Sequence, residues 1–296
     1  ADTLIGLAEY MPGELMSEAL ALARTIQSAS DRSRALSKLA EYMPGELMSE
    51  ALAVARTIPS ASDRARALSG LAKYVPEVVS EALAVVRTIQ SASDRSRALS
   101  KLAEYMPGEL MSEALALVRT IQDEYYRSRA LIGLAKYVPG ELMSEALALA
   151  RTIQDESDQA YALIELAKYV PGELMSEALA LARTIPSGYF RSIALIGLAK
   201  YVPRELMSEA LALVRTIQDE SNRTDALSGL MRQLKTIEAD ILLWKDAFHT
   251  LTYQGRNYFI TNIPNLAPAT ISLAGGDKAV LTLVAEAMRD VCRQWP

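Results

Sequence analysis

The stretch SDRSRALSKLAEYMPGELMSEALAVARTI, residues 30–58, decides the fold of this chain. In its first half, Ala35, Leu36 and Leu39 recur at the intervals of three and four residues that place side chains on one face of an α-helix. Pro44 ends this helix, because proline lacks an amide donor and clashes with the preceding turn. The second half shows the same helical spacing. The stretch therefore predicts a hairpin of two helices, each of about 13 residues and roughly 20 Å long.

The residues at the two helix starts are suited to capping. Ser30 or Asp31 is expected to be the N-cap of the first helix, accepting a hydrogen bond from an amide of the first turn. Glu46 and Glu50 lie near the start of the second helix, where the helix dipole favours negative charge. The array shows no alternating pattern that would predict strands.

The stretch is one copy of a repeat. One tyrosine marks each copy, at steps of 31 or 32 residues: Tyr10, Tyr42, Tyr74, Tyr105, Tyr137, Tyr169 and Tyr201. Residues 24–53 and 87–116 are identical. A pair of short helices cannot bury its apolar face alone, so successive hairpins must stack. The predicted fold is all-α: an α-solenoid of about seven 32-residue helical-hairpin repeats, similar to tetratricopeptide and HEAT superhelices, with a C-terminal helical cap.

We predict a repeat array over residues 1–233 and a capping region over residues 234–296. One helix of the cap is expected to contain Trp244, His249 and Tyr253. Gly275-Gly276 then interrupts the chain, Asp277 can act as a cap, and residues 278–293 form the last amphipathic helix. Because the chain begins inside the first helix of a repeat, we expect further sequence upstream.

Composition excludes several classes of function. The 296 residues carry a net charge of −5, which argues against a nucleic-acid partner, since such partners need clustered basic charge. His249 and Cys292 are the only residues of their kinds, so no catalytic triad or Cys- and His-based metal site is expected. We expect both to pack in apolar surroundings. No apolar run is long enough to span a membrane. The chain is expected to be cytoplasmic, to need no cofactor or metal, and not to be an enzyme.

The repeats and the ending resemble the C-terminal helical repeats of bacterial STAND NTPases, the prokaryotic relatives of NOD-like receptors. The similarity is carried by ALIGLAKYVPGELMSEALALARTIQDE (130–156) and LAPATISLAGGDKAVLTLVAEAMRDVCRQWP (266–296). It implies a sensor region that recognises a protein or peptide trigger and contacts upstream domains of the same polypeptide. The chain lacks the G-x-x-x-x-G-K-[ST] nucleotide loop, so nucleotide chemistry is not expected of these residues.

Copies of the repeat differ mainly in the first turn of the first helix. The Ser30-Asp31 position becomes Tyr125-Tyr126 in one copy and Tyr189-Phe190 in another, and the Arg34 position becomes Tyr161 or Ile193. In stacked hairpins these positions fall along one edge, and exposed aromatic residues on one edge are typical of interaction hot spots. The candidate partner-binding residues are therefore Tyr125, Tyr126, Tyr161, Tyr189, Phe190 and Ile193. The alternative is a structural scaffold or oligomerisation spacer without a dedicated ligand.

Two other repeated features have structural interpretations. Glutamate pairs such as Glu46 and Glu50 could hold a cation, but arginines recur in step with them, so interleaved Arg–Glu ladders on a solvated face are favoured. The repeated tyrosines are expected to pack between hairpins, with each phenol reaching a neighbouring carbonyl.

Overall fold

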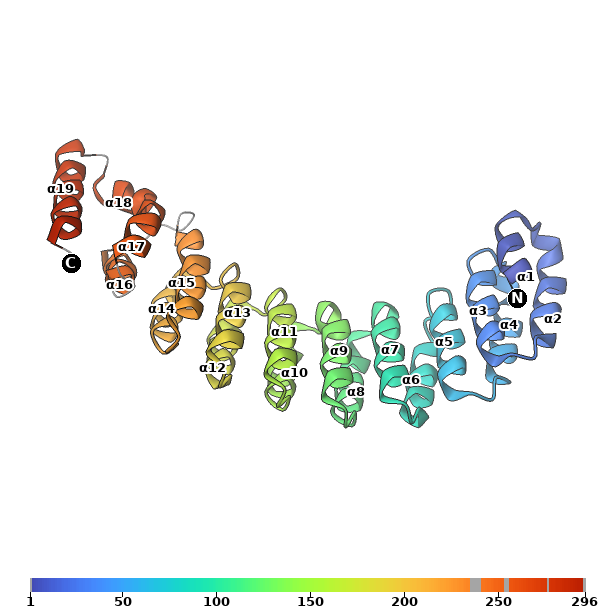
Figure 1. The fold of residues 1–296 in the computed structure, drawn as a ribbon. Coiled ribbons are helices and arrows are strands. Elements are labelled where there is room, and N and C mark those ends of the chain that lie inside the picture. The colour runs from blue at the N-terminus through green and yellow to red at the C-terminus, as the bar shows by residue number, and fades with distance from the viewer. Residues whose placement is uncertain (1, 235–240, 253–255, 276, 295–296) are drawn as a thin grey trace. The chain divides into compact units, whose positions relative to one another are not determined.

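The computed structural model describes residues 2–234, 241–252, 256–275 and 277–294 (Figure 1). Within those ranges the chain forms helices and connecting turns, with no strand, and within each unit successive helices pack against one another in series. The prediction of an all-α helical-repeat solenoid is confirmed. Tyr253, Gly276 and the side chain of Cys292, all considered above, lie outside the described part. Among the described residues, no helix combines the length and apolar character needed to cross a lipid bilayer.

Each hairpin consists of a first and a second helix. The first helices are α1 (Asp2–Leu7), α3 (Ala29–Leu39), α5 (Ala61–Leu71), α7 (Ala92–Leu102), α9 (Glu124–Leu134), α11 (Glu156–Ala167), α13 (Gly188–Leu198) and α15 (Glu220–Leu234). The second helices are α2 (Met16–Thr25), α4 (Met48–Arg56), α6 (Val78–Thr88), α8 (Gly108–Arg119), α10 (Met143–Arg151), α12 (Met175–Thr184) and α14 (Met207–Arg215). The chain continues through α16 (Ile241–Thr252), α17 (Arg256–Asn262), α18 (Ala267–Leu273) and α19 (Lys278–Gln294).

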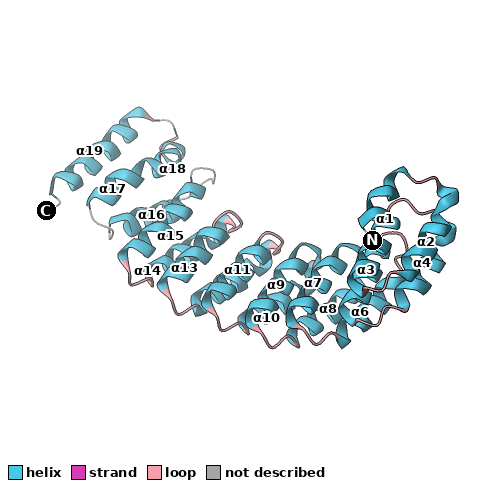
Figure 2. Ribbon diagram, turned by 45° about the vertical axis from the view of Figure 1, so that its right-hand side comes forward, coloured by secondary structure: helices cyan, strands magenta, loops and turns pink. Residues whose placement is uncertain are grey.

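The chain divides into two compact units, Ala1–Leu149 and Ala150–Pro296. In the first unit, each first helix from α1 to α9 packs on the next, and second helices lie against them. Figure 2 shows the short loops that join these helices. Ala35, Leu36 and Leu39 of α3 are fully buried, as the helical spacing predicts. Burying one leucine side chain contributes roughly 1.5–3 kcal/mol, so these apolar stripes hold the stack together.

In the second unit, α11, α13 and α15 pack on one another, and α12 and α14 lie against them. Beyond the repeats, α16 packs on α14, while α17 and the turn Ile263–Leu266 pack on α15. These helices cover the last hairpin, which is the role expected of a cap. The division at residue 233 stays a prediction.

The aromatic residues of the cap form one cluster. Trp244 and Phe248 stack at 5.0 Å between ring centroids, and Phe248 meets the fully buried Phe259 edge-on at 5.4 Å. His249 is exposed, so its expected packing in apolar surroundings is wrong: it follows Phe248 directly and lies off the face that the aromatic pair occupies. At the predicted boundary, Gly275 has a φ of 58°, and Asp277 Oδ1 accepts a hydrogen bond from the Ala279 amide at 2.8 Å.

The expected N-cap and the expected end of the first helix are both wrong. Ser28, not Ser30 or Asp31, caps α3, because its extended backbone lets Oγ accept a hydrogen bond from the Asp31 amide at 3.2 Å. The same position is serine or aspartate in the later copies: Ser60, Ser91, Asp123, Asp155, Ser187 and Asp219. The α-helix ends at Leu39, and a turn, in which the Tyr42 amide donates to the Leu39 carbonyl at 3.0 Å, separates it from Met43 and Pro44. Proline restricts only the residue before it, so it does not set the end of the α-helix.

One position sets the spacing between first helices. It holds Gly70 in α5 and Gly133 in α9, and each glycine packs against a serine of the preceding first helix so closely that a Cβ would clash. In α3 and α7 the same position is Lys38 or Lys101. The pairs α3–α5 and α7–α9 are accordingly in closer contact than α5–α7. Glycine brings two first helices together, and lysine keeps them apart.

Candidate functional site

Each first helix of the early repeats carries two arginines, and the first of them is structural. Arg32 donates to the Ile26 carbonyl from Nε at 2.8 Å and from Nη2 at 2.6 Å. The bond satisfies a carbonyl left unpaired at the end of the preceding second helix. Equivalent arginines bond the equivalent carbonyls: Arg64, Arg95, Arg127, Arg191 and Arg223. In α11, Gln159 replaces the arginine and donates to the Ala150 and Arg151 carbonyls at 3.4 Å.

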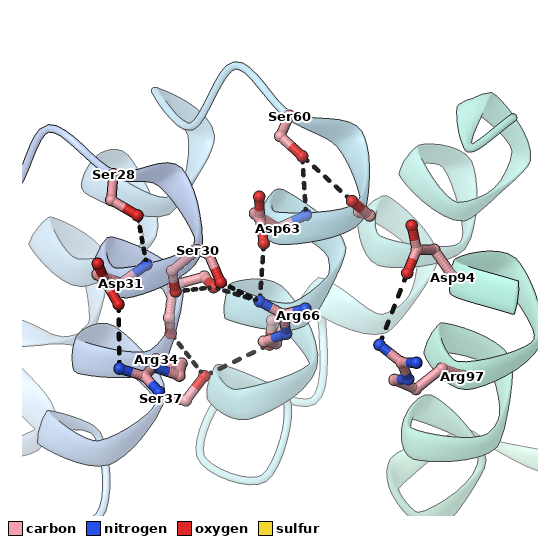
Figure 3. Close-up of polar contacts among 12 residues, drawn as sticks. Ser28, Ser30, Asp31, Arg34, Ser37, Ser60, Asp63, Arg66, Asp94 and Arg97 are labelled. Atoms are coloured by element: carbon pink, nitrogen blue, oxygen red, sulfur yellow. Dashed lines mark hydrogen bonds and ion pairs between the residues drawn. The ribbon is translucent and has the colours of Figure 1, made fainter. Parts of the chain in front are cut away.

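The second arginine lies on the outer surface of the first helices. We call Arg34, Arg66, Arg97 and Arg129 the outer arginines. In Figure 3, Arg34 Nη2 contacts Asp31 Oδ1 at 3.0 Å, and Arg97 Nη1 lies 3.6 Å from Asp94 Oδ1. Pairs of this kind at an exposed surface contribute only about 0.2–1 kcal/mol, so they leave the guanidinium groups available to a ligand.

Arg66 shows how an outer arginine bridges two hairpins (Figure 3). Its Nη1 contacts Asp63 Oδ1 at 2.7 Å on its own helix. The same nitrogen reaches the hydroxyls of Ser30 and Ser33 on α3, each at 3.2 Å. A guanidinium group has five donors in a planar fork, so further acceptors can bind beside the aspartate.

The α9 helix departs from this pattern. Tyr126 takes the place of the aspartate, and Tyr125 takes the place of the neighbouring serine. Arg129 consequently makes no ion pair with any residue that the structure describes. The two rings meet edge-on, with centroids 5.1 Å apart, and Tyr125 is 55% exposed. An aromatic pair therefore stands beside an exposed guanidinium that lacks a counter-charge.

These residues line a groove between α7 and α9. The groove has a volume of about 380 Å³, and its lining includes Arg97, Arg129, Tyr125, Tyr126 and Gly133. No aspartate or glutamate is among its lining residues in the described chain. The close approach of α9 to α7 at Gly133 fixes the spacing of the helices that form its walls. The groove offers two cations and two aromatic rings on rigid helices.

The second unit holds the remaining candidate residues. Tyr189 is 55% exposed, and its ring meets that of the half-buried Phe190 edge-on at 5.1 Å. Tyr161 on α11 is exposed, whereas Ile193 on α13 is half-buried. The structure therefore places four of the six candidates in two ring pairs, Tyr125 with Tyr126 in the first unit and Tyr189 with Phe190 in the second. Tyr161 and Ile193 belong to neither pair. Tyr161 and Ile193 occupy the position of the outer arginines, so this face is less basic in the second unit than in the first.

The outer arginines were not predicted from the sequence. Tyr125 and Tyr126 stand out because they differ between copies, whereas Arg34 and its equivalents do not, because four copies share them. A signal was present. The position of Arg32 is arginine in nearly every copy, whereas that of Arg34 becomes Tyr161, Ile193 or Asp225 in later copies. A carbonyl-bonding role tolerates little change, and a surface role tolerates more.

The predicted Arg–Glu ladder is confirmed from α4 to α10, where three arginines pair with a glutamate of the next second helix. Arg56 donates from Nε and Nη2 to the two carboxylate oxygens of Glu81 at 2.9 and 2.8 Å. Arg87 pairs with Glu113 at 2.6 Å, and the nearest atoms of Arg119 and Glu145 lie 3.7 Å apart. The hydrogen bonds from Arg56 lower the pKa of Glu81 below its ordinary value.

We expect Arg56→Gln to raise the pKa of Glu81, because the bidentate partner is lost. A carboxylate whose pKa is lowered by folding stabilises the fold above its unfolded pKa, about 4.3, and loses this contribution as the pH falls through the folded pKa. The free energy of unfolding of the wild-type chain should therefore be about 0.5 kcal/mol higher than that of the variant at neutral pH. In acid the two should be equal. Urea unfolding across this pH range measures the difference.

The control for this experiment is Arg24→Gln, since Arg24 makes no described ion pair. The free energy of unfolding of Arg24→Gln should be close to that of the wild-type chain at every pH. A loss for Arg56→Gln that stays constant as the pH falls would contradict the ion-pair explanation.

The repeated tyrosines do not make the expected carbonyl contacts. None of those described donates from its phenol to a neighbouring carbonyl, and Tyr42, Tyr169 and Tyr201 are between 36% and 41% exposed. Instead, Lys38 lies over the Tyr42 ring with its ammonium 5.1 Å from the centroid, and Lys136 lies over Tyr137 at 5.3 Å. These rings close the surface at the ends of the first helices through cation–π contacts.

Comparisons with known proteins identify no family. No protein-family model and no curated protein matches the sequence. Among solved structures, the chain is similar to Ton1535 from Thermococcus onnurineus NA1, at 15% identity and a TM-score of 0.35, over 90% of this chain and 98% of that one. A second similarity is to a structure titled "Computational Design of Self-Assembling Cyclic Protein Homooligomers", at 17% identity and a TM-score of 0.18, over 95% of this chain and 97% of that one.

Proposed function

We propose that this chain is a non-catalytic recognition module that binds a protein or peptide trigger through the outer surface of its first helices. One observation carries the proposal. The groove between α7 and α9 places Tyr125 and Tyr126 beside Arg97 and an unpaired Arg129. Tyrosine and arginine are among the residues most enriched in interaction hot spots.

The support for a binding role is physical. An exposed aromatic ring removes apolar area from water when it docks against a partner. Because the two rings already pack against each other, binding costs little additional side-chain entropy. Tyr189 and Phe190 repeat this arrangement in the second unit, where the pair again lies in the first turn of a first helix.

The resemblance to STAND NTPase repeats extends the proposal to the whole polypeptide. A trigger that binds the repeats would change their contacts with upstream domains of a cytoplasmic switch, shifting the population between inactive and active states. This extension rests on the quoted sequence stretches, 130–156 and 266–296, and on the helical-repeat architecture.

A peptide-display selection on the chain tests the proposal. Peptides that bind the wild-type chain should lose at least about ten-fold in affinity for a variant with four substitutions, because hot-spot aromatics dominate binding. The substitutions are Tyr125→Ser, Tyr126→Ser, Tyr189→Ser and Phe190→Ser.

A matched control removes four other exposed tyrosines by the same change to serine: Tyr10, Tyr42, Tyr169 and Tyr201. It should keep wild-type affinity. A selection that yields no binder, or binders that the first variant retains in full, would contradict recognition and favour the scaffold alternative.

A further inference from the structure

The two layers of helices in the first unit carry opposite charge. The stretches 29–42, 61–74, 92–105 and 124–137, which are first helices with their closing turns, contain twelve Lys or Arg and six Asp or Glu. The second helices α4, α6 and α8, counted with the residues that lead into them, each contain two glutamates and one arginine. A chain with a net charge of −5 thus presents one strongly basic layer. Its partner should be acidic.

The basic layer has neighbouring hollows. A hollow of about 410 Å³ lies over α5 and contains Gly70; its charged lining residues are Arg34, Lys38, Arg66, Lys101, Glu41 and Glu104. A small cleft, lined also by Asp94, shares Arg66 with this hollow and Arg97 with the groove between α7 and α9. The hollow exists because Gly70 lies between two longer side chains at the equivalent position, Lys38 and Lys101.

Each first helix contributes one outer arginine. Packed helices lie roughly 8–10 Å apart, with α3–α5 and α7–α9 in closer contact than α5–α7. A polyproline-II segment advances about 3.1 Å per residue and presents the same face every third residue, a repeat of about 9.3 Å. A β-strand repeats its face about every 6.8 Å, which does not match. Carboxylates at every third residue of a polyproline-II segment would meet successive arginines.

We propose that the first unit binds an acidic polyproline-II segment whose carboxylates recur at every third residue. The segment crosses α3, α5, α7 and α9, so four carboxylates meet the four outer arginines over about ten residues. The groove with Tyr125 and Tyr126 takes a proline ring of the segment, since aromatic-lined grooves hold polyproline-II ligands. This inference rests on the proposed function and names the chemistry of its ligand.

Charge spacing disfavours a nucleic acid. One strand of a duplex carries a phosphate for about every 3.4 Å of helix axis, so it presents more negative charges along this surface than there are outer arginines. Three of the outer arginines also lie next to an aspartate of their own helix, Asp31, Asp63 or Asp94. A segment with one carboxylate per three residues brings less negative charge to these aspartates than a strand with a phosphate at every nucleotide.

Synthetic peptides test directly whether the carboxylates of the ligand must recur at every third residue, which we call its register. A labelled peptide (Glu-Pro-Pro)₄ is compared by fluorescence anisotropy with two isomers of equal charge and composition, Glu₄Pro₈ and Pro₄(Glu-Pro)₄. We expect (Glu-Pro-Pro)₄ to bind the full chain at least about ten-fold more tightly than either isomer, because only its carboxylates match the arginine period. Equal binding of the three peptides would overturn the inference.

Two double variants locate the site. The first combines Arg97→Gln with Arg129→Gln and should weaken (Glu-Pro-Pro)₄ binding at least about ten-fold. The second, the control, combines Arg87→Gln with Arg119→Gln. It removes the same charge from the opposite layer and should leave binding unchanged. The peptide (Lys-Pro-Pro)₄ serves as a probe that needs no variant to fold, and it should not bind. Equal losses in both double variants, or tighter binding of the oligonucleotide (dT)₁₂ than of (Glu-Pro-Pro)₄, would overturn the inference.

The outcome separates this inference from the proposed function. If display selects peptides that require Tyr125 and Tyr126 while the three glutamate isomers bind alike, the recognition role stands and the acidic register is wrong. If (Glu-Pro-Pro)₄ binds in an arginine-dependent manner but no selected peptide depends on the tyrosines, the register stands and the aromatic role is wrong.

Discussion

Gly133→Ala is expected to lower the free energy of unfolding by about 1–3 kcal/mol, although alanine is the better helix former. A Cβ at this position would lie 2.5 Å from the Cβ of Ser100 and 3.1 Å from its Cα. The α7 and α9 helices must then separate, and the apolar contacts between them are weakened. Urea unfolding monitored by circular dichroism measures the loss.

Two further variants test whether crowding is the cause. Gly45→Ala should be neutral, because a Cβ there meets no atom within 4 Å. Ser100→Gly should restore part of the stability lost in Gly133→Ala, since it removes the side chain that the new methyl group strikes. A loss that persists in full in the double variant would contradict the steric explanation.

Arg191→Met is expected to lower the free energy of unfolding by about 1–2 kcal/mol, because it leaves the partly buried Ile185 carbonyl without its side-chain donor. Arg191 donates to the Ile185 carbonyl from Nε at 2.9 Å and from Nη2 at 2.8 Å, and its Nη1 reaches Thr216 Oγ1 at 3.1 Å. Methionine keeps the apolar stem of the side chain and loses all of these hydrogen bonds. Hydrogen exchange of the α13 amides and urea unfolding both report the effect.

The chain supplies the control for this prediction. In α11 the equivalent position is Gln159, which donates to two carbonyls at the end of α10. Arg191→Gln should therefore cost less than half as much as Arg191→Met. If the two variants lose the same stability, charge and not the hydrogen bond to the carbonyl is responsible.

The helices could be predicted because their cause is local. Ala35, Leu36 and Leu39 are buried for the reason that their spacing indicates, and the stacking of hairpins follows from the need to cover that stripe. The N-cap could not be chosen by residue type alone, because Ser28, Ser30 and Asp31 all have a suitable oxygen. The choice depends on where the chain becomes extended after Ile26, which is a backbone property.

The candidate site was predicted only in part. Tyr125 and Tyr126 stood out as departures from the repeat, and the structure places them side by side. Arg32 and Arg34 look alike in the sequence, two residues apart. Only the fold shows that the Arg32 guanidinium turns back six residues to the Ile26 carbonyl, while that of Arg34 stays at the surface. Roles that depend on contacts between hairpins are not visible in the pattern of one hairpin.

The alternation of glycine and lysine also constrains how the array can change its length. It makes the first unit periodic in two hairpins, and the identical segments 24–53 and 87–116 are two hairpins apart. Homologous recombination between the segments would add or remove 63 residues and leave each glycine facing its serine. Excision of one hairpin would place two lysine-bearing helices in succession and break the pairing. The gene can therefore lengthen or shorten this unit without repacking only in two-hairpin steps.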